Sequence, residues 1–249
     1  MLFRSKKFLN QITEQDKTLN ADYTTRLQDT VFNNYLGWLP TQPITQAELT
    51  NLGSELKGTV PFVKKVSANS RDPKELDVVI ENQEFKLGYI TKYVKINSTT
   101  DVFGSDSVDV LLNTTLGKQY VKEIYKILER KIQSANRGVA DESDKALFDA
   151  VAKNLTGDCV LIVNTANFNE IFEYIPQFKE LNITLVFAEL ETYKYIVLDR
   201  NQIKLLYGED PRIGIAEDME DFLKNTLTLG LNALSDIAFN PMSISAIAQ

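Results

Sequence analysis

The sequence contains no histidine and a single cysteine, Cys159. Without histidine, the chain cannot form a Ser-His-Asp or Cys-His catalytic site, and it cannot form the His-rich or Cys-rich sites that bind zinc. Any catalysis would depend on carboxylates, lysine, tyrosine or a bound cofactor. A single cysteine also excludes a disulfide within the chain, which favours a reducing compartment. Because Cys159 opens an apolar run, we interpret it as a small buried side chain.

Long apolar runs and glycine-rich loops are also missing. No run reaches the roughly 18 apolar residues of a membrane span, and the basic start of the chain lacks the apolar core of a signal peptide. The 11 glycines are scattered and match neither a P-loop nor the glycine fingerprint of dinucleotide-binding folds. We therefore expect a cytosolic product that is not embedded in a membrane and has no cofactor.

The charge balance is acidic, with a formal net charge of -7. A general phosphate-binding surface is therefore not expected. The chain has 249 residues, which suits one large domain or two small ones and allows a substantial core.

The strongest periodic signal lies between residues 105 and 138. Apolar residues recur there at every fourth position, which is typical of an amphipathic helix. A helix through most of this span would be on the order of 40 Å long at 1.5 Å per residue. We expect Gly138 at the left-handed position after its end, one buried stripe, no break near Gly117 and no catalytic group on it. The stripe comprises Val108, Leu112, Leu116, Tyr120, Ile124 and Leu128.

Strand patterns lie on both sides of this helix. Residues 58–97 alternate apolar and polar side chains around a polar turn at 67–75, which predicts a long two-stranded hairpin. Pro176 is expected to end a short helix, and residues 208–211 to form a turn. The other predicted elements are helices at 22–36, 141–157 and 167–175 and strands at 159–163, 184–187, 193–198, 203–207 and 226–231.

Several carboxylates are candidates for chemistry. Glu189 and Glu191 lie two residues apart after a strand, which places both on one face, with Asp199 downstream. The same spacing is common on solvated edges. The acidic pairs at 209–210, 217–218 and 220–221 could hold a divalent metal, but they lack calcium-loop spacing, so we interpret them as solvated surface.

The hairpin and the segment before it contain the candidate contact residues. Basic and acidic side chains alternate along the hairpin, and this mixture favours protein–protein contact over nucleic acid, with a simple solvated hairpin as the alternative. Trp38 lies in a non-helical segment and packs either on its own domain or on another subunit. The candidate inter-subunit contacts are Trp38, Lys64, Lys65, Arg71, Lys74, Glu75 and Glu81.

Two stretches carry a family resemblance. Residues 85–107 read FKLGYITKYVKINSTTDVFGSDS, and residues 221–241 read DFLKNTLTLGLNALSDIAFNP. These two stretches resemble the major capsid proteins of tailed bacteriophages, which have the Hong Kong 97-type shell fold. The order of the predicted elements matches as well: an arm, a hairpin, a long helix, a second helix, a mixed sheet and a final strand.

The resemblance implies an α+β fold and a structural function without catalysis. The protein would assemble as hexamers and pentamers into an icosahedral shell that encloses double-stranded DNA without sequence-specific binding. A separate scaffolding protein and a portal would be partners, and the protein would be made in the host cytoplasm and end in the virion. The implied parts are an N-terminal arm (1–57), an extended β-hairpin loop (58–88), a peripheral domain (89–155 and 206–249) with a spine helix (107–136), and a mixed-sheet axial domain (156–205).

Two other functions stay open. A small α/β binding protein or carboxylate-dependent enzyme would use the sheet at 158–207, with Glu189, Glu191 and Asp199 in a concave pocket. Another phage head or tail structural protein would share the hairpin but would not need so long a helix.

Overall fold

The computed structural model describes residues 25–52, 55–68, 76–97, 112–139, 143–155, 157–216 and 226–249. The chain forms two compact units. The first comprises Met1–Gly37, Tyr89–Val121 and Glu209–Leu234, and the second comprises Trp38–Gly88, Lys122–Gly208 and Ser235–Gln249.

A five-stranded mixed sheet forms the core of the second unit, in the order β5-β11-β8-β6-β7. β6 pairs in parallel with β7 and antiparallel with β8, and β11 pairs antiparallel with β8 and in parallel with β5. All six residues of β6 are buried, which explains its unbroken apolar run. The sequence predicted three of these strands, and the segments 138–139 and 244–248 were not predicted as strands. The strands are β5 (Gly138–Val139), β6 (Cys159–Asn164), β7 (Thr184–Ala188), β8 (Tyr193–Asp199) and β11 (Ile244–Ala248).

Short helices pack on this sheet. Helix α4 (Asp144–Asn154) is capped by Ser143, whose side chain accepts a hydrogen bond from the Ala146 N–H, as an N-cap residue does. Helices α5 (Phe168–Ile171) and α6 (Ile175–Glu180) follow β6. The prediction that Pro176 ends a helix was wrong: it lies in the first turn of α6, where proline costs no hydrogen bond. The shared core includes Leu147, Val151, Leu161, Phe178 and Val197.

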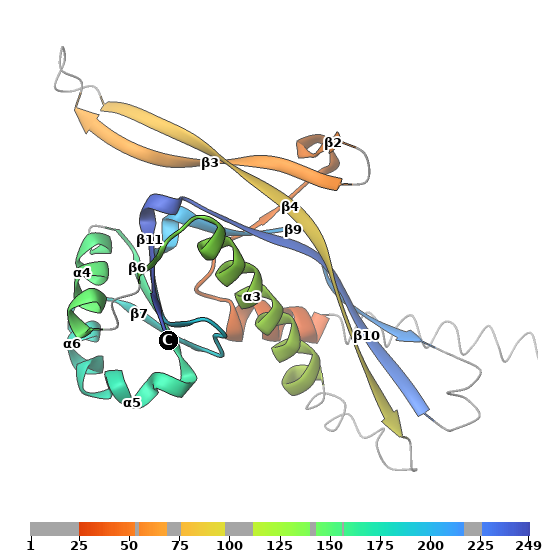
Figure 1. Cartoon of the computed structure of the whole chain (residues 1–249). Coiled ribbons are helices and arrows are strands. Elements are labelled where there is room, and N and C mark those ends of the chain that lie inside the picture. Colours follow the sequence, from red (N-terminus) through yellow and green to blue (C-terminus); the bar gives the residue numbers. More distant parts are fainter. Residues whose placement is uncertain are drawn as a thin grey trace, which may run out of the picture. The chain divides into compact units, whose positions relative to one another are not determined.

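The second sheet has six strands in the order β1-β9-β10-β4-β3-β2, and its β3 and β4 form the long hairpin predicted from the sequence (Figure 1). The expected turn at 208–211 was wrong, because β9 continues through it. In the described part of the chain β1 pairs with β9 at 205–207. Pro211 lies beyond the end of β1 on that side of β9, and an open strand edge tolerates proline. The strands are β1 (Thr41–Pro43), β2 (Thr50–Leu52), β3 (Glu55–Ala68), β4 (Leu76–Asn97), β9 (Ile203–Ala216) and β10 (Thr226–Phe239).

The predicted long helix is present but differs in detail. A π-helical turn, η3 (Leu112–Gly117), leads directly into α3 (Lys118–Ser134), so the hydrogen-bond pattern changes at Gly117 although the helix continues. Residues 98–111, with the predicted start and Val108, lie outside the described residues. The predicted stripe is buried at Leu116, Tyr120, Ile124 and Leu128, and Ile132 extends it.

The end of α3 is set by Asn136 and not by Gly138. Asn136 has φ 52°, its N–H donates to the Gln133 carbonyl, and the Arg137 N–H donates to the Ile132 carbonyl. These two bonds define a Schellman motif, in which asparagine is the residue that most often replaces glycine. The helix therefore ends at Ser134, two residues before the predicted 136, and Gly138 belongs to β5.

One glycine at the base of the hairpin is fixed by close packing. A Cβ on Gly58 would lie 2.5 Å from Phe85 Cζ and 2.7 Å from the Glu48 carbonyl oxygen, whereas a Cβ on Gly88 meets nothing within 4 Å. We expect Gly58→Ala to lower the free energy of unfolding by about 1–3 kcal/mol through overpacking, and Gly88→Ala to leave it nearly unchanged. Urea unfolding of the two variants measures this, and equal midpoints would contradict the packing.

Candidate functional site: the hairpin and a polar pocket

The base of the β3–β4 hairpin has one buried face. Opposed residues and alternate residues share a face in an antiparallel pair, and the register pairs Phe62 with Glu81 and Val60 with Gln83. Val60, Phe62, Phe85 and Leu87 therefore lie on the same face, and each is at most 5% exposed. This face attaches the hairpin to its own unit.

In the outer half of the hairpin, four apolar side chains lie on the opposite face, while Val79, which is also exposed, stays on the face of the base. Val63 pairs with Ile80, and Val66 pairs with Val78. Their exposed fractions are 42, 61, 54 and 51% in that order. We call these four residues the distal aliphatic face. Because it points away from the buried face, the unit that covers the base does not cover it.

A β-bulge at Lys64 creates this face. Val63 and Val66 are three residues apart, an odd spacing that places side chains of a regular strand on opposite faces. The register shifts between Val63 and Lys65, so that Lys64 is the extra residue, and the bulge returns Val66 to the face of Val63. No sequence pattern marks the bulge, so the distal aliphatic face was missed.

The predicted contact residues of the hairpin are only partly described. Lys64 Nζ lies 3.2 Å from Glu81 Oε2, and both side chains are exposed by more than a third, so the structure brings these two predicted residues together. Lys65 lies in β3 opposite Val79. Arg71, Lys74 and Glu75 lie outside the described residues.

Trp38 packs within its own unit. Its Nε1–H donates to the Tyr125 hydroxyl at 3.2 Å, and the two rings are stacked. Burial raises the pKa of Tyr125 to about 12, although the hydrogen bond from Trp38 has the smaller, opposite effect of lowering it. Trp38 is 8% exposed, which leaves little surface for a neighbouring subunit. Of the two interpretations of Trp38, the structure favours packing on its own domain.

A second exposed apolar cluster lies on the five-stranded sheet and its helices. The Phe168 ring lies 5.7 Å from Phe172 and 5.3 Å from Phe187, between centroids. All three side chains are more than a third exposed. They lie on α5, the turn after it and β7, the outer strand of the sheet.

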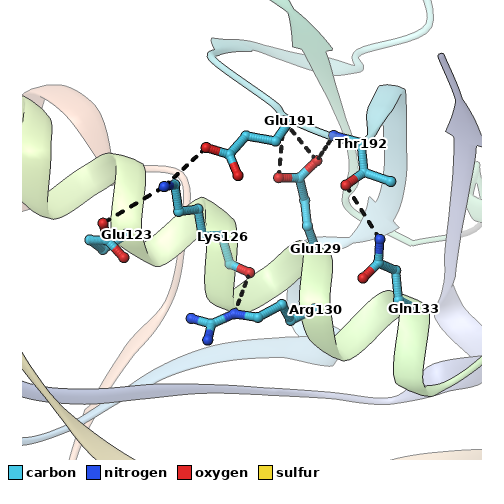
Figure 2. A pocket seen from close by; sticks show the side chains of 7 residues that line it. All are labelled: Glu123, Lys126, Glu129, Arg130, Gln133, Glu191 and Thr192. Atoms are coloured by element: carbon cyan, nitrogen blue, oxygen red, sulfur yellow. Dashed lines mark hydrogen bonds and ion pairs between the residues drawn. The ribbon is translucent and has the colours of Figure 1, made fainter.

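A shallow polar pocket of about 440 Å³ lies between α3 and the turn that joins β7 to β8 (Figure 2). At its centre Glu129, only 3% exposed, accepts hydrogen bonds from the backbone N–H groups of Glu191, Thr192 and Tyr193. The pocket is lined by Glu123, Lys126, Glu129, Arg130, Gln133, Glu191 and Thr192.

The candidate acids of the enzyme hypothesis do not form one site. Glu189 pairs with Lys122 at 3.2 Å and Glu191 with Lys126 at 3.0 Å. Asp199 lies at the far end of β8, about 20 Å along a strand from the turn, where it accepts the N–H groups of Asn201 and Asp158. These carboxylates therefore have structural partners at two separate places.

Other candidate chemistry has little support in the described residues. Burial raises the pKa of the Cys159 thiol to about 11, so it is not a thiolate nucleophile at neutral pH. Among the described side chains, no group of three or more acidic or cysteine residues could hold a metal ion; the acidic residues 217–221 lie outside them. No helix in the described ranges is long and apolar enough to cross a membrane.

The chain matches no protein-family model, and no curated protein matches it in sequence. Solved structures do match. A virus-like particle from Pyrococcus furiosus is 16% identical over 92% of this chain and 99% of its own, with a TM-score of 0.63. A structure from Microbacterium phage Oxtober96 is 12% identical over 85% and 89%, with a TM-score of 0.52. The capsid of the cyanophage P-SCSP1u is 9% identical over 85% and 86%, with a TM-score of 0.51.

At these identities the likeness shows the fold. The chain has the α+β fold of phage capsid structures, and the predicted Hong Kong 97-type fold is confirmed.

Proposed function

We propose that this chain, which has the Hong Kong 97-type capsid fold, is the major capsid protein of a tailed bacteriophage. Many copies would assemble into an icosahedral shell that encloses the double-stranded DNA genome, without turnover chemistry. The observation that carries the proposal is the coverage of the structural match: 92% of this chain superposes on 99% of a subunit from a virus-like particle. The likeness therefore includes nearly the whole particle subunit and not one shared motif.

The distal aliphatic face is the surface we assign to contact with a second copy of the chain. Its four side chains are exposed in the single chain and lie opposite the face that attaches the hairpin to its own unit. They offer only a few hundred Å² of apolar surface, below the roughly 800 Å² that each partner buries in a standard stable interface. One such contact is weak. In a closed shell, however, every subunit makes this contact with one neighbour and accepts it from another, so the contacts reinforce one another. This favours a second copy over a single tight partner.

The parts of the chain keep the roles that the family resemblance implies. Residues 1–57 are the arm, 58–88 the extended loop, 89–155 and 206–249 the peripheral domain, and 156–205 the axial domain. The exposed Phe168, Phe172 and Phe187 cluster is a further candidate contact in the axial domain. Hexamers and pentamers, a separate scaffolding protein and a portal complete the proposal, with the virion as the final location.

Expression of the chain with and without its scaffolding partner tests the proposal. We expect large particles by size-exclusion chromatography, and closed shells with hexameric and pentameric units by negative-stain electron microscopy. A strictly monomeric species in all salt conditions and with the scaffold present would overturn it.

A virus-like particle that does not enclose a phage genome is a second candidate. The specific observation is the TM-score of 0.63 to the Pyrococcus furiosus particle, against 0.51 and 0.52 for the phage structures. Particles isolated from the native source separate the two functions. Nuclease-resistant DNA of genome length inside them supports the phage capsid, and particles without such DNA support the second candidate.

A further inference from the structure

Helix α3 has a polar stripe in addition to its apolar one. Lys122, Lys126, Glu129 and Gln133 follow one another at spacings of four, three and four residues, which places them along one side of a helix. Each of them contacts the turn between β7 and β8. From the sequence alone, these residues are indistinguishable from an ordinary solvated helix face.

We propose that this stripe and the turn at 189–193 form a latch, in which Glu129 is the positioning residue that holds the turn docked on α3. The two states of the latch are a docked turn and a released turn. The latch consists of contacts within one unit of one chain and does not depend on the proposed function.

The centre of the latch is a buried carboxylate bound by backbone. Glu129 Oε1 lies 2.8 Å from the Thr192 nitrogen and 3.1 Å from that of Glu191, with Tyr193 at 3.3 Å. Figure 2 shows the carboxylate aimed at this turn from α3. Burying a carboxylate is costly unless hydrogen bonds replace its water, and charge-assisted bonds from consecutive N–H groups do so. The bonds depend on the backbone shape of the turn, so they select the docked state.

The outer contacts of the latch are weaker. The Lys122–Glu189 and Lys126–Glu191 pairs have glutamate side chains that are 72 and 54% exposed. Exposed pairs contribute little, and salt screens them. Gln133 Nε2 lies 3.3 Å from Thr192 Oγ1. Glu129 is the one deeply buried group of the stripe, so we assign it the holding function.

The position of the turn in the sheet allows it to open as a unit. It follows β7, the outer strand, which has β6 as its neighbour in the sheet. The β6–β8 and β8–β11 pairs do not include β7, and of the residues in the turn only Tyr193 takes part in them, where it pairs with Ala248. On the other side, Asn164 Nδ2 and Gln249 Nε2 donate to the Leu190 carbonyl. Release therefore requires loss of the α3 contacts and of these two hydrogen bonds. It also requires loss of the bond from the Gln249 N–H to the Thr192 carbonyl and of the end pair Tyr193–Ala248, but not of the remaining pairs of β8 with β6 and β11.

Hydrogen exchange with mass spectrometry tests the latch. We expect Glu129→Ala to speed exchange of the amides of residues 191–193 by about tenfold or more, as for a local opening, and Glu129→Gln to have an intermediate effect because it keeps one acceptor oxygen. Lys126→Ala, the comparison variant on the same stripe, and 1 M salt remove only exposed contacts and are expected to speed exchange of these amides much less than Glu129→Ala does. The amides of β6 report the integrity of the fold.

Two results would overturn the proposal. One is unchanged exchange at 191–193 in both Glu129 variants. The other is an equal increase with Lys126→Ala or with high salt, which would assign the holding to the surface ion pairs. If Glu129→Ala also speeds exchange of the β6 amides, the Glu129→Gln variant is the deciding test. Faster exchange at 191–193 with protected β6 amides in that variant supports the latch. Unchanged exchange at 191–193 contradicts it.

Discussion

Replacement of Val78 and Ile80 by aspartate is expected to abolish particle assembly while the single chain keeps its fold. These two side chains are 51 and 61% exposed, so charges there cost the isolated chain little. In the proposed interface each carboxylate would be desolvated without a partner, at a cost of several kcal/mol per charge, and the cost recurs at every subunit. Negative-stain microscopy and size-exclusion chromatography measure assembly, and circular dichroism measures the fold.

The matched control lies on the same face of the same strand. Asn82 is exposed, pairs with Pro61 and lies nearer the base than Ile80, outside the distal aliphatic face. Asn82→Asp is expected to assemble like the unmodified chain. Particles of normal yield from the Val78→Asp, Ile80→Asp double variant would show that the distal aliphatic face is not an interface, and would leave the capsid proposal itself standing.

Asp236→Ala is expected to cause the largest loss of stability, about 3–5 kcal/mol, out of the 5–15 kcal/mol that is usual for a folded domain. The Asp236 carboxylate is buried and accepts hydrogen bonds from Lys131 Nζ at 2.5 Å and from the Lys86 N–H at 2.7 Å. It thus joins β10 to α3 and to the hairpin strand β4. Alanine leaves a partly buried ammonium and a backbone N–H without this partner. The urea unfolding midpoint of the unassembled chain measures the loss.

Two controls distinguish loss of the buried Asp236 hydrogen bonds from loss of a charge in general. Asp236→Asn keeps the shape and one acceptor oxygen, so we expect a smaller loss than with alanine. Lys122→Ala breaks an exposed pair and is expected to change stability by less than about 1 kcal/mol. An Asp236→Ala midpoint within the range of Lys122→Ala would contradict this account.

The sequence predicted elements whose side-chain period is regular and missed those decided by tertiary contacts. The alternation of apolar and polar residues in 58–97 predicted the hairpin. The apolar residue at every fourth position before residue 134 predicted the buried stripe of α3. Pro211 suggested a turn because nothing local shows that it lies on a sheet edge. Gly138 was the expected helix stop, but Asn136 adopts the left-handed conformation first, and asparagine tolerates it at low cost.

The candidate sites were harder to predict than the fold. Charged residues suggested the hairpin as a contact surface, and Lys64 and Glu81 do pair there. The aliphatic side chains of the same segment depend on a bulge and a strand register, which only the folded chain defines. Glu129 looked like any polar residue on a helix, since its three N–H donors come from residues more than 60 positions away.

The place of β11 in its sheet has a consequence for the order of folding. β11 lies between β5 and β8, yet residues 244–248 are synthesised after every other strand of that sheet. Until they leave the ribosome, β8 has an open edge and β5 has no neighbour in the sheet. Pairing of segments so distant in sequence is slow, and an open edge invites pairing with other chains. Completion of this sheet is therefore a late event in biogenesis, which delays the folded subunit until residues 244–248 have left the ribosome.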